Sequence, residues 1–157
     1  GWAARAAALR YEPIVTVYLR CPGARLQAPM TALVEGPDAP AQFAFDHGAI
    51  GGTPGLFAFV ASGARRWVDA GLDATGAAVL HQATRAFAPG TWPHAPTLLR
   101  VLAEKRATFR CTPALDRPPQ RVAAGLLAAG DYVEGPYPAT LEGAVRAGEA
   151  AAAMLDG

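Results

Sequence analysis

The segment that decides the fold reads Leu126-Leu127-Ala128-Ala129-Gly130-Asp131, and after a short loop it continues as Ala139-Thr140-Leu141-Glu142-Gly143-Ala144-Val145-Arg146-Ala147-Gly148. An apolar run that ends in Gly-Asp, followed by a run of small residues, is typical of a strand leading into a helix. This order predicts that Asp131 lies at the carboxyl end of the strand and faces the amino end of the helix. In open α/β sheets this edge binds nucleotide cofactors, and a helix amino terminus offers unpaired N–H groups. The segment therefore indicates part of a cofactor site.

The predicted closing helix carries a stripe of small side chains at steps of three and four residues. Its members are Thr140, Gly143, Ala144, Ala147, Gly148 and Ala151. Two glycines inside a helix cost roughly 1 kcal/mol each, so something must approach this stripe closely. Tight packing against a sheet explains the stripe as well as a ligand does. The preceding Gly130-Asp131 and Pro138 favour the ligand.

Composition excludes several classes of function. The chain has 157 residues, of which 52% are hydrophobic, and its net charge is +1. This charge gives no electrostatic reason to expect nucleic acid or an anionic membrane as a partner. The two cysteines, Cys21 and Cys111, are expected to be small core residues, and no secretion signal is present, so the cytoplasm is the expected compartment.

The remaining elements follow from hydrophobic period and from proline and glycine positions. Strands are expected over 14–19, 30–34, 42–46, 56–61 and 98–109, helices over 2–10 and 73–87, and a proline-rich linker over 111–120. The glycine-rich turn at 47–55 is too short for a crossover, so the two strands beside it are predicted to be antiparallel. Asp73 is the expected N-cap of the middle helix. The fold class is therefore α+β, an antiparallel sheet with a covering helix followed by one β–α unit.

Other polar residues give weaker signals. His47, His81 and His94 lie far apart with no metal-ligand spacing, so no metal site is predicted. The pair Asp46-His47 is either a proton relay or, more commonly, the cap of a strand and the start of a turn. Lys105 and Arg117 are each consistent with a ligand contact or with an ordinary surface position.

Four phenylalanines occupy every second position in two neighbouring predicted strands. They are Phe43, Phe45, Phe57 and Phe59. We expect half of them to build the core between sheet and helix. The others remain candidates for lining an apolar substrate tunnel.

The final segment closely resembles the carboxyl-terminal flavin motif of the FAD-dependent amine oxidase and phytoene desaturase superfamily. The residues that carry the resemblance are 127–132 and 137–148. The likeness extends to Glu104-Lys105-Arg106-Ala107-Thr108-Phe109, Pro113 and Arg117-Pro118, and to the strand that begins at Tyr11. The nearest branch is that of the squalene-associated desaturases, which are hydroxysqualene dehydroxylases of hopanoid synthesis.

The resemblance implies a domain division and a set of FAD contacts. Residues 1–115 would form part of a substrate-binding domain, and residues 116–157 would be the closing β–α unit of a Rossmann-like FAD-binding domain. Asp131 would contact the ribityl–pyrophosphate region, and the N–H groups of Thr140 and Leu141 would face the pyrimidine edge of the flavin. The cofactor-binding residues implied are Gly130, Asp131, Pro138, Ala139, Thr140 and Leu141. No catalytic residue is implied.

Two departures from the superfamily pattern matter. The Gly-x-Gly-x-x-Gly fingerprint is absent, because Gly48, Gly51, Gly52 and Gly55 have a different spacing. The chain is therefore expected to be a carboxyl-terminal fragment that needs an amino-terminal FAD-binding part. Thr140 stands where amine oxidases often have an aromatic residue, so an isoprenoid substrate fits better than an amine.

The function implied is that of an FAD-dependent oxidoreductase acting on an isoprenoid such as hydroxysqualene. A carotenoid or phytoene desaturase and a protoporphyrinogen or amine oxidase share the motif and remain alternatives. The fragment alone is expected neither to retain FAD nor to turn over substrate, and a non-catalytic homodimer is a further alternative. No nucleic acid is expected as a partner, and peripheral attachment to the inner membrane is left open.

Overall fold

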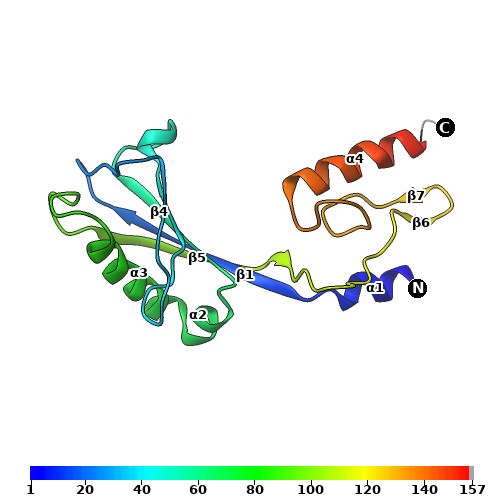
Figure 1. Ribbon diagram of the computed structural model, residues 1–157, viewed down its shortest axis with the longest axis horizontal. Coiled ribbons are helices and arrows are strands. Elements are labelled where there is room, and N and C mark those ends of the chain that lie inside the picture. Colours follow the sequence, from blue (N-terminus) through cyan, green and yellow to red (C-terminus); the bar gives the residue numbers. More distant parts are fainter. Residues whose placement is uncertain (156–157) are drawn as a thin grey trace. The chain divides into compact units, whose positions relative to one another are not determined.

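The computed structural model describes residues 1–155, and they form two compact units. The first unit contains residues 1–11 and the chain from Thr108 onward, and the second contains Glu12–Ala107. Figure 1 shows the elements of both units. The division differs from the predicted boundary near residue 115, because the first residues of the chain belong with its last ones. The assignment of substrate and FAD binding to the two parts remains a prediction.

The larger unit is built on one five-stranded antiparallel sheet. Its strands are β1 (Tyr11–Arg20), β2 (Met30–Ala32), β3 (Phe43–Asp46), β4 (Leu56–Ser62) and β5 (Thr97–Phe109). They lie side by side in the order β2-β3-β4-β1-β5. The predicted antiparallel hairpin is confirmed, since β3 pairs with β4 with Phe45 opposite Ala58. A 3₁₀ turn at Gly48–Ile50 lies in the connection between these two strands.

Side chains alternate along the strands, so the sheet has a buried face and an opposite face, which we call the second face. Val15, Val17 and Leu19 of β1 are buried, and in β4 both Phe57 and Phe59 are fully buried. The helices α2 (Arg65–Ala70) and α3 (Leu72–Ala86) pack on this buried face, as Figure 1 shows for the larger unit. Because side chains alternate between faces, the intervening residues point to the second face, which neither helix covers. The second-face residues include Ile14, Thr16, Tyr18, Met30, Phe43, Phe45, Leu56, Ala58 and Val60.

A buried glutamine fastens α3 to the loop between β2 and β3. The Gln82 side chain accepts a hydrogen bond from the Ala41 N–H at 2.8 Å and donates to the Ala41 carbonyl at 2.8 Å. It also donates to the Val34 carbonyl at 3.2 Å. All of its hydrogen-bonding groups are satisfied, so this polar side chain is structural.

The structure corrects the predicted start of the long helix. Asp73 is not the N-cap, because α3 begins at Leu72 after Gly71. The positive φ of Gly71 turns the chain directly out of α2, and the Thr75 hydroxyl donates to the Gly71 carbonyl at 2.9 Å. Asp73 lies in the first turn, where its charge still interacts favourably with the helix dipole. The short helix α2 was not predicted.

The smaller unit joins the two ends of the chain. It contains α1 (Trp2–Ala8), β6 (Arg121–Ala123), β7 (Leu126–Leu127) and α4 (Leu141–Leu155). The Trp2 indole donates to the Pro119 carbonyl at 2.6 Å, and its ring meets Tyr132 edge-on. An exposed ion pair links Arg5 to Asp116. These contacts hold α1 against the proline-rich segment, which is irregular as predicted.

The predicted closing strand is shorter than expected and has a different partner. Only Leu126–Leu127 is strand, and it forms an antiparallel hairpin with β6, which was not predicted. The strand-then-helix order is present, because α4 follows β7 after a loop. Within the described residues β7 joins no parallel sheet.

The two cysteines lie in different environments. Cys21 is fully buried in the core, as expected, and its thiol donates to the His94 carbonyl. Cys111 is exposed, so the expectation that it is a core residue is wrong. It lies two residues after the end of β5, at the start of the proline-rich segment.

Candidate functional site

A hollow of about 230 Å³ lies between the first turns of α4 and the loop that precedes this helix. Asp131, Val133 and Glu134 line it from the loop, and Gly143, Arg146 and Ala147 line it from α4. The backbone carbonyl of Asp131 accepts a hydrogen bond from the Ala139 N–H at 3.3 Å. The Asp131 carboxylate has no hydrogen-bond partner among residues 1–155 and therefore stays available to a ligand.

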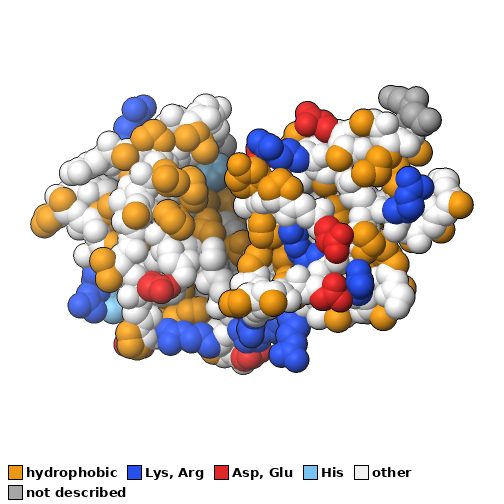
Figure 2. Space-filling model, turned by 45° about the vertical axis from the view of Figure 1, so that its right-hand side comes forward, with side chains coloured by type: hydrophobic (Ala, Val, Ile, Leu, Met, Phe, Trp, Pro, Cys, Tyr) orange, Lys and Arg blue, Asp and Glu red, His pale blue; other side chains and the backbone are white. Residues whose placement is uncertain are grey.

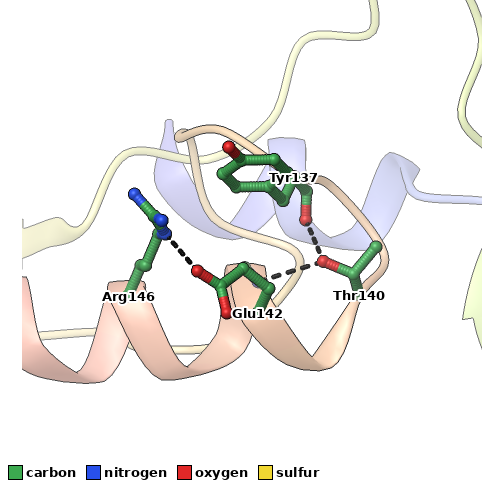
Figure 3. Close-up of polar contacts among 5 residues, drawn as sticks. Tyr137, Thr140, Glu142 and Arg146 are labelled. Carbon is green, nitrogen blue, oxygen red and sulfur yellow. Dashed lines mark hydrogen bonds and ion pairs between the residues drawn. The ribbon is translucent and has the colours of Figure 1, made fainter.

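The start of α4 is capped by Thr140, as Figure 3 shows. The Thr140 hydroxyl accepts a hydrogen bond from the Gly143 N–H at 3.0 Å and donates to the Tyr137 carbonyl at 2.6 Å. This is the N-cap arrangement, which satisfies one of the unpaired donors of the first turn. The same residue was predicted to face a cofactor with its backbone.

Two further N–H groups at this helix start remain unpaired. Those of Leu141 and Glu142 have no partner within the described residues, as helix geometry requires for the first turn. The Leu141 side chain is 88% exposed, so nothing from the smaller unit covers this end. Positive ends of helix dipoles and free N–H donors together suit an electron-rich group.

Close packing explains one glycine of the small-residue stripe and leaves the other unexplained. A Cβ added to Gly143 would lie 2.2 Å from the Tyr137 carbonyl oxygen, so the close approach of the chain's own backbone requires glycine here. Gly148 has nothing within 4 Å of the corresponding position. Tight packing therefore explains Gly143, and packing within the described residues leaves Gly148 without a reason.

The turn into α4 is held in an unusual backbone conformation. Tyr137 and Ala139, on either side of Pro138, have φ values of 54° and 58°. Left-handed backbone is unfavourable for residues with a Cβ, by roughly 1–2 kcal/mol each. The cation of Arg146 lies 4.9 Å above the Tyr137 ring and also pairs with Glu142 at 2.6 Å. These contacts fix the turn that presents the helix start.

Arg117 shapes the loop that carries Asp131. Its guanidinium donates to the carbonyls of Val133 at 2.7 Å and Asp131 at 3.5 Å, and also to that of Gly135. The guanidinium makes no ion pair within residues 1–155. The interpretation of Arg117 as a ligand or surface residue is therefore replaced by a role in holding three loop carbonyls, which nothing in the sequence signalled.

Of the six predicted cofactor residues, one lines the hollow. Asp131 is that residue, while Thr140 and Leu141 form the exposed helix start. Gly130 lies in the bend after β7, and Pro138 and Ala139 lie in the turn before α4. Their predicted contacts with FAD stay predictions.

The other candidate residues have structural roles. The buried Asp46 carboxylate accepts hydrogen bonds from the N–H groups of Leu26 and Ala49, so it caps the turn. His47 meets the Tyr18 ring edge-on. Lys105 is exposed on β5. No group of three or more potential metal ligands occurs in the described part of the chain.

The comparison with protein-family models decides the family. Residues 1–155 match the model of flavin-containing amine oxidoreductases. The chain belongs to this family. The match covers both units, so the likeness is not confined to the closing motif. No curated protein matched the chain as a relative. The family is flavin-containing, and its members are oxidoreductases.

The site of this family member fits one side of a flavin. Free N–H donors at the exposed start of α4 suit an electron-rich ring, and the unpartnered Asp131 carboxylate in the hollow suits hydroxyl groups. The hollow is smaller than the cavities of about 300–1,000 Å³ that usually enclose a ligand of drug size. Within residues 1–155 no helix has both the length and the apolar character needed to cross a membrane.

Proposed function

We propose that this chain is the carboxyl-terminal part of an FAD-dependent oxidoreductase acting on an isoprenoid. The observation that carries the cofactor is the open start of α4 beside the unpaired Asp131 carboxylate. The N–H groups of Leu141 and Glu142 would donate to the pyrimidine edge of the flavin. Asp131 would accept hydrogen bonds from the hydroxyls of the ribityl–ribose region. When bound, the flavin supplies hydride exchange with a substrate carbon.

The second face of the five-stranded sheet supports an apolar substrate. Phe43 and Phe45 lie there, while Phe57 and Phe59 are buried in the core, so the four predicted aromatics divide equally. Cross-strand neighbours on this face are also apolar, with Val60 opposite Phe43 and Met30 opposite Phe45. A polyene binds to such a surface through burial of its apolar area. Hydroxysqualene fits this surface better than a charged amine does.

The remaining wall of the flavin site would come from an amino-terminal FAD-binding part of the same protein. Hydrophobic side chains remain exposed along α4, including Leu141, Val145 and Leu155. Figure 2 shows hydrophobic side chains gathered over α4 close to its carboxyl end. Such a helix face is expected to be covered by the rest of a Rossmann-like domain.

The test uses the purified full-length gene product, with its flavin reduced and oxygen excluded for hydroxysqualene, and with its flavin oxidised and oxygen or a quinone present as acceptor for the other three substrates. It is incubated separately with hydroxysqualene, phytoene, protoporphyrinogen and a primary amine, and the products are identified by mass spectrometry. We expect squalene from hydroxysqualene, with the hydroxyl lost as water and a hydride gained at carbon. Conversion of phytoene alone would favour the carotenoid desaturase alternative, and amine oxidation alone would overturn the isoprenoid proposal.

A second measurement tests the proposed contact between Asp131 and FAD. In the full-length protein, Asp131→Asn is expected to lower the retained FAD, measured by absorbance of the denatured protein. Asp69→Asn at an exposed position of α2 makes the same chemical change, serves as the matched control and should leave the FAD content unchanged. Equal retention in the two variants would remove Asp131 from the site.

A further inference from the structure

The five-stranded sheet ends in two very different edges. One edge is β2, which has only three residues, and the other is β5, which has 13. Proteins usually shorten, cover or charge an edge strand, because its outward backbone groups can pair with another chain. The strand β5 is long enough to pair along most of one side of the sheet.

The amino-terminal half of β5 is also apolar and exposed. Leu98, Leu99 and Leu102 have exposed fractions of 41%, 57% and 39%. Val101 and Ala103 pack against the core. An exposed apolar edge strand of this kind favours strand addition by another polypeptide.

The charges of β5 are arranged to suit a second copy of the same strand. Alternation places Arg100, Leu102 and Glu104 together on the face opposite Val101 and Ala103. In an antiparallel pair centred on Leu102, Arg100 of each copy would lie opposite the partner's Glu104. A two-fold axis makes every such contact occur twice.

Neighbouring registers are less favourable. Shifting the pairing by one or two residues toward the carboxyl end would place Arg100 opposite Lys105 or Arg106 of a second copy, and the opposite shift would place it opposite Ala103 or Leu102 and lose the ion pairs. Like charges directly opposite each other destabilise strand pairs, whereas opposite charges stabilise them. Glu104 uses Oε1 to accept the Arg106 N–H at 2.9 Å, so its second oxygen remains for the cross-strand arginine.

We propose that β5 is a homodimer interface. Two copies pair their β5 strands antiparallel about Leu102, which joins the two sheets into one and packs Leu102 against its own copy. The two Arg100–Glu104 pairs set the register. This interface is separate from the proposed flavin wall at α4, so either proposal stands without the other.

The test is a charge exchange in the full chain, in reducing buffer because Cys111 is exposed. Dimer dissociation constants are measured by sedimentation from micromolar to near-millimolar concentration. Arg100→Glu and Glu104→Arg are each expected to weaken the dimer at least about tenfold, or about 1.4 kcal/mol. An equimolar mixture of the two variants should associate as the unmodified chain does, because each then faces an opposite charge. The doubly exchanged variant should also recover.

Matched controls separate pairing from net charge and from folding. Arg85→Glu on α3 and Asp69→Arg on α2 change the charge equally at exposed positions and should leave the dissociation constant unchanged. Circular dichroism checks that each variant is folded. A monomer at every concentration, a dimer insensitive to the β5 exchanges, or a mixture that fails to recover would each overturn the proposal.

Discussion

Packing requires glycine at Gly143 of α4 but not at Gly148 of the same helix. A Cβ at Gly143 would meet the Tyr137 backbone at 2.2 Å, whereas a Cβ at Gly148 would meet nothing within 4 Å. Backbone cannot move aside as a flexible side chain can. The first glycine is therefore required by the smaller unit itself, and the second is not.

Substitution by alanine should separate these two positions. We expect Gly143→Ala to lower the free energy of unfolding by at least about 2 kcal/mol through this clash. Gly148→Ala should raise it by about 0.5–1 kcal/mol, because alanine favours the helix. Chemical denaturation followed by circular dichroism measures both. Equal effects at the two positions would contradict the close approach of the Tyr137 backbone to Gly143.

Arg117 makes a second prediction at the residue scale. Removing its guanidinium leaves three carbonyls without a charged donor, and hydrogen bonds to charged groups are worth about 1.5–3 kcal/mol. Arg117→Ala should therefore speed amide hydrogen exchange in residues 131–139. Arg117→Lys should protect only partly, because an ammonium lacks the planar fork of donors. Unchanged exchange in both variants would contradict the role assigned to Arg117.

At the scale of elements, the sheet shows which predictions local sequence supports. The alternation in 42–46 and 56–61 predicted two strands and their antiparallel pairing, and the structure confirms both. The short elements α2 and β6 were not predicted, because they have too few residues to show a hydrophobic period. Asp73 was misplaced as a cap because the preceding glycine, with its positive φ, makes the turn instead. Tertiary contacts such as those of Arg117 leave no local pattern.

The two faces of the sheet predict different costs for the same substitution. Phe59→Ala should destabilise by about 3–5 kcal/mol, because a fully buried ring leaves a cavity. Phe43→Ala, with its side chain 37% exposed on the second face, should cost less than about 1 kcal/mol. Chemical denaturation compares them directly. A larger cost at Phe43 would mean that another part of the chain covers the second face.

At the scale of the whole molecule, the family match and the proposed cofactor site differ in extent. The match covers residues 1–155, whereas the described residues offer a hollow of only about 230 Å³. The sequence resemblance predicted the family, which the match confirms.

The expected consequence is weak flavin binding by this chain alone. Purified in the presence of added FAD and then desalted, it should retain far less than one flavin per chain, as read from visible absorbance. The full-length protein, treated in parallel, should retain a stoichiometric amount. Full retention by the chain alone would show that residues 1–157 build a complete pocket.

The two cysteines make this chain convenient for spectroscopy. Because Cys21 is sealed in the core and Cys111 is exposed, a maleimide dye or nitroxide will attach at one known position without mutagenesis. Double electron–electron resonance between two such labels would then report the separation of paired copies in frozen solution.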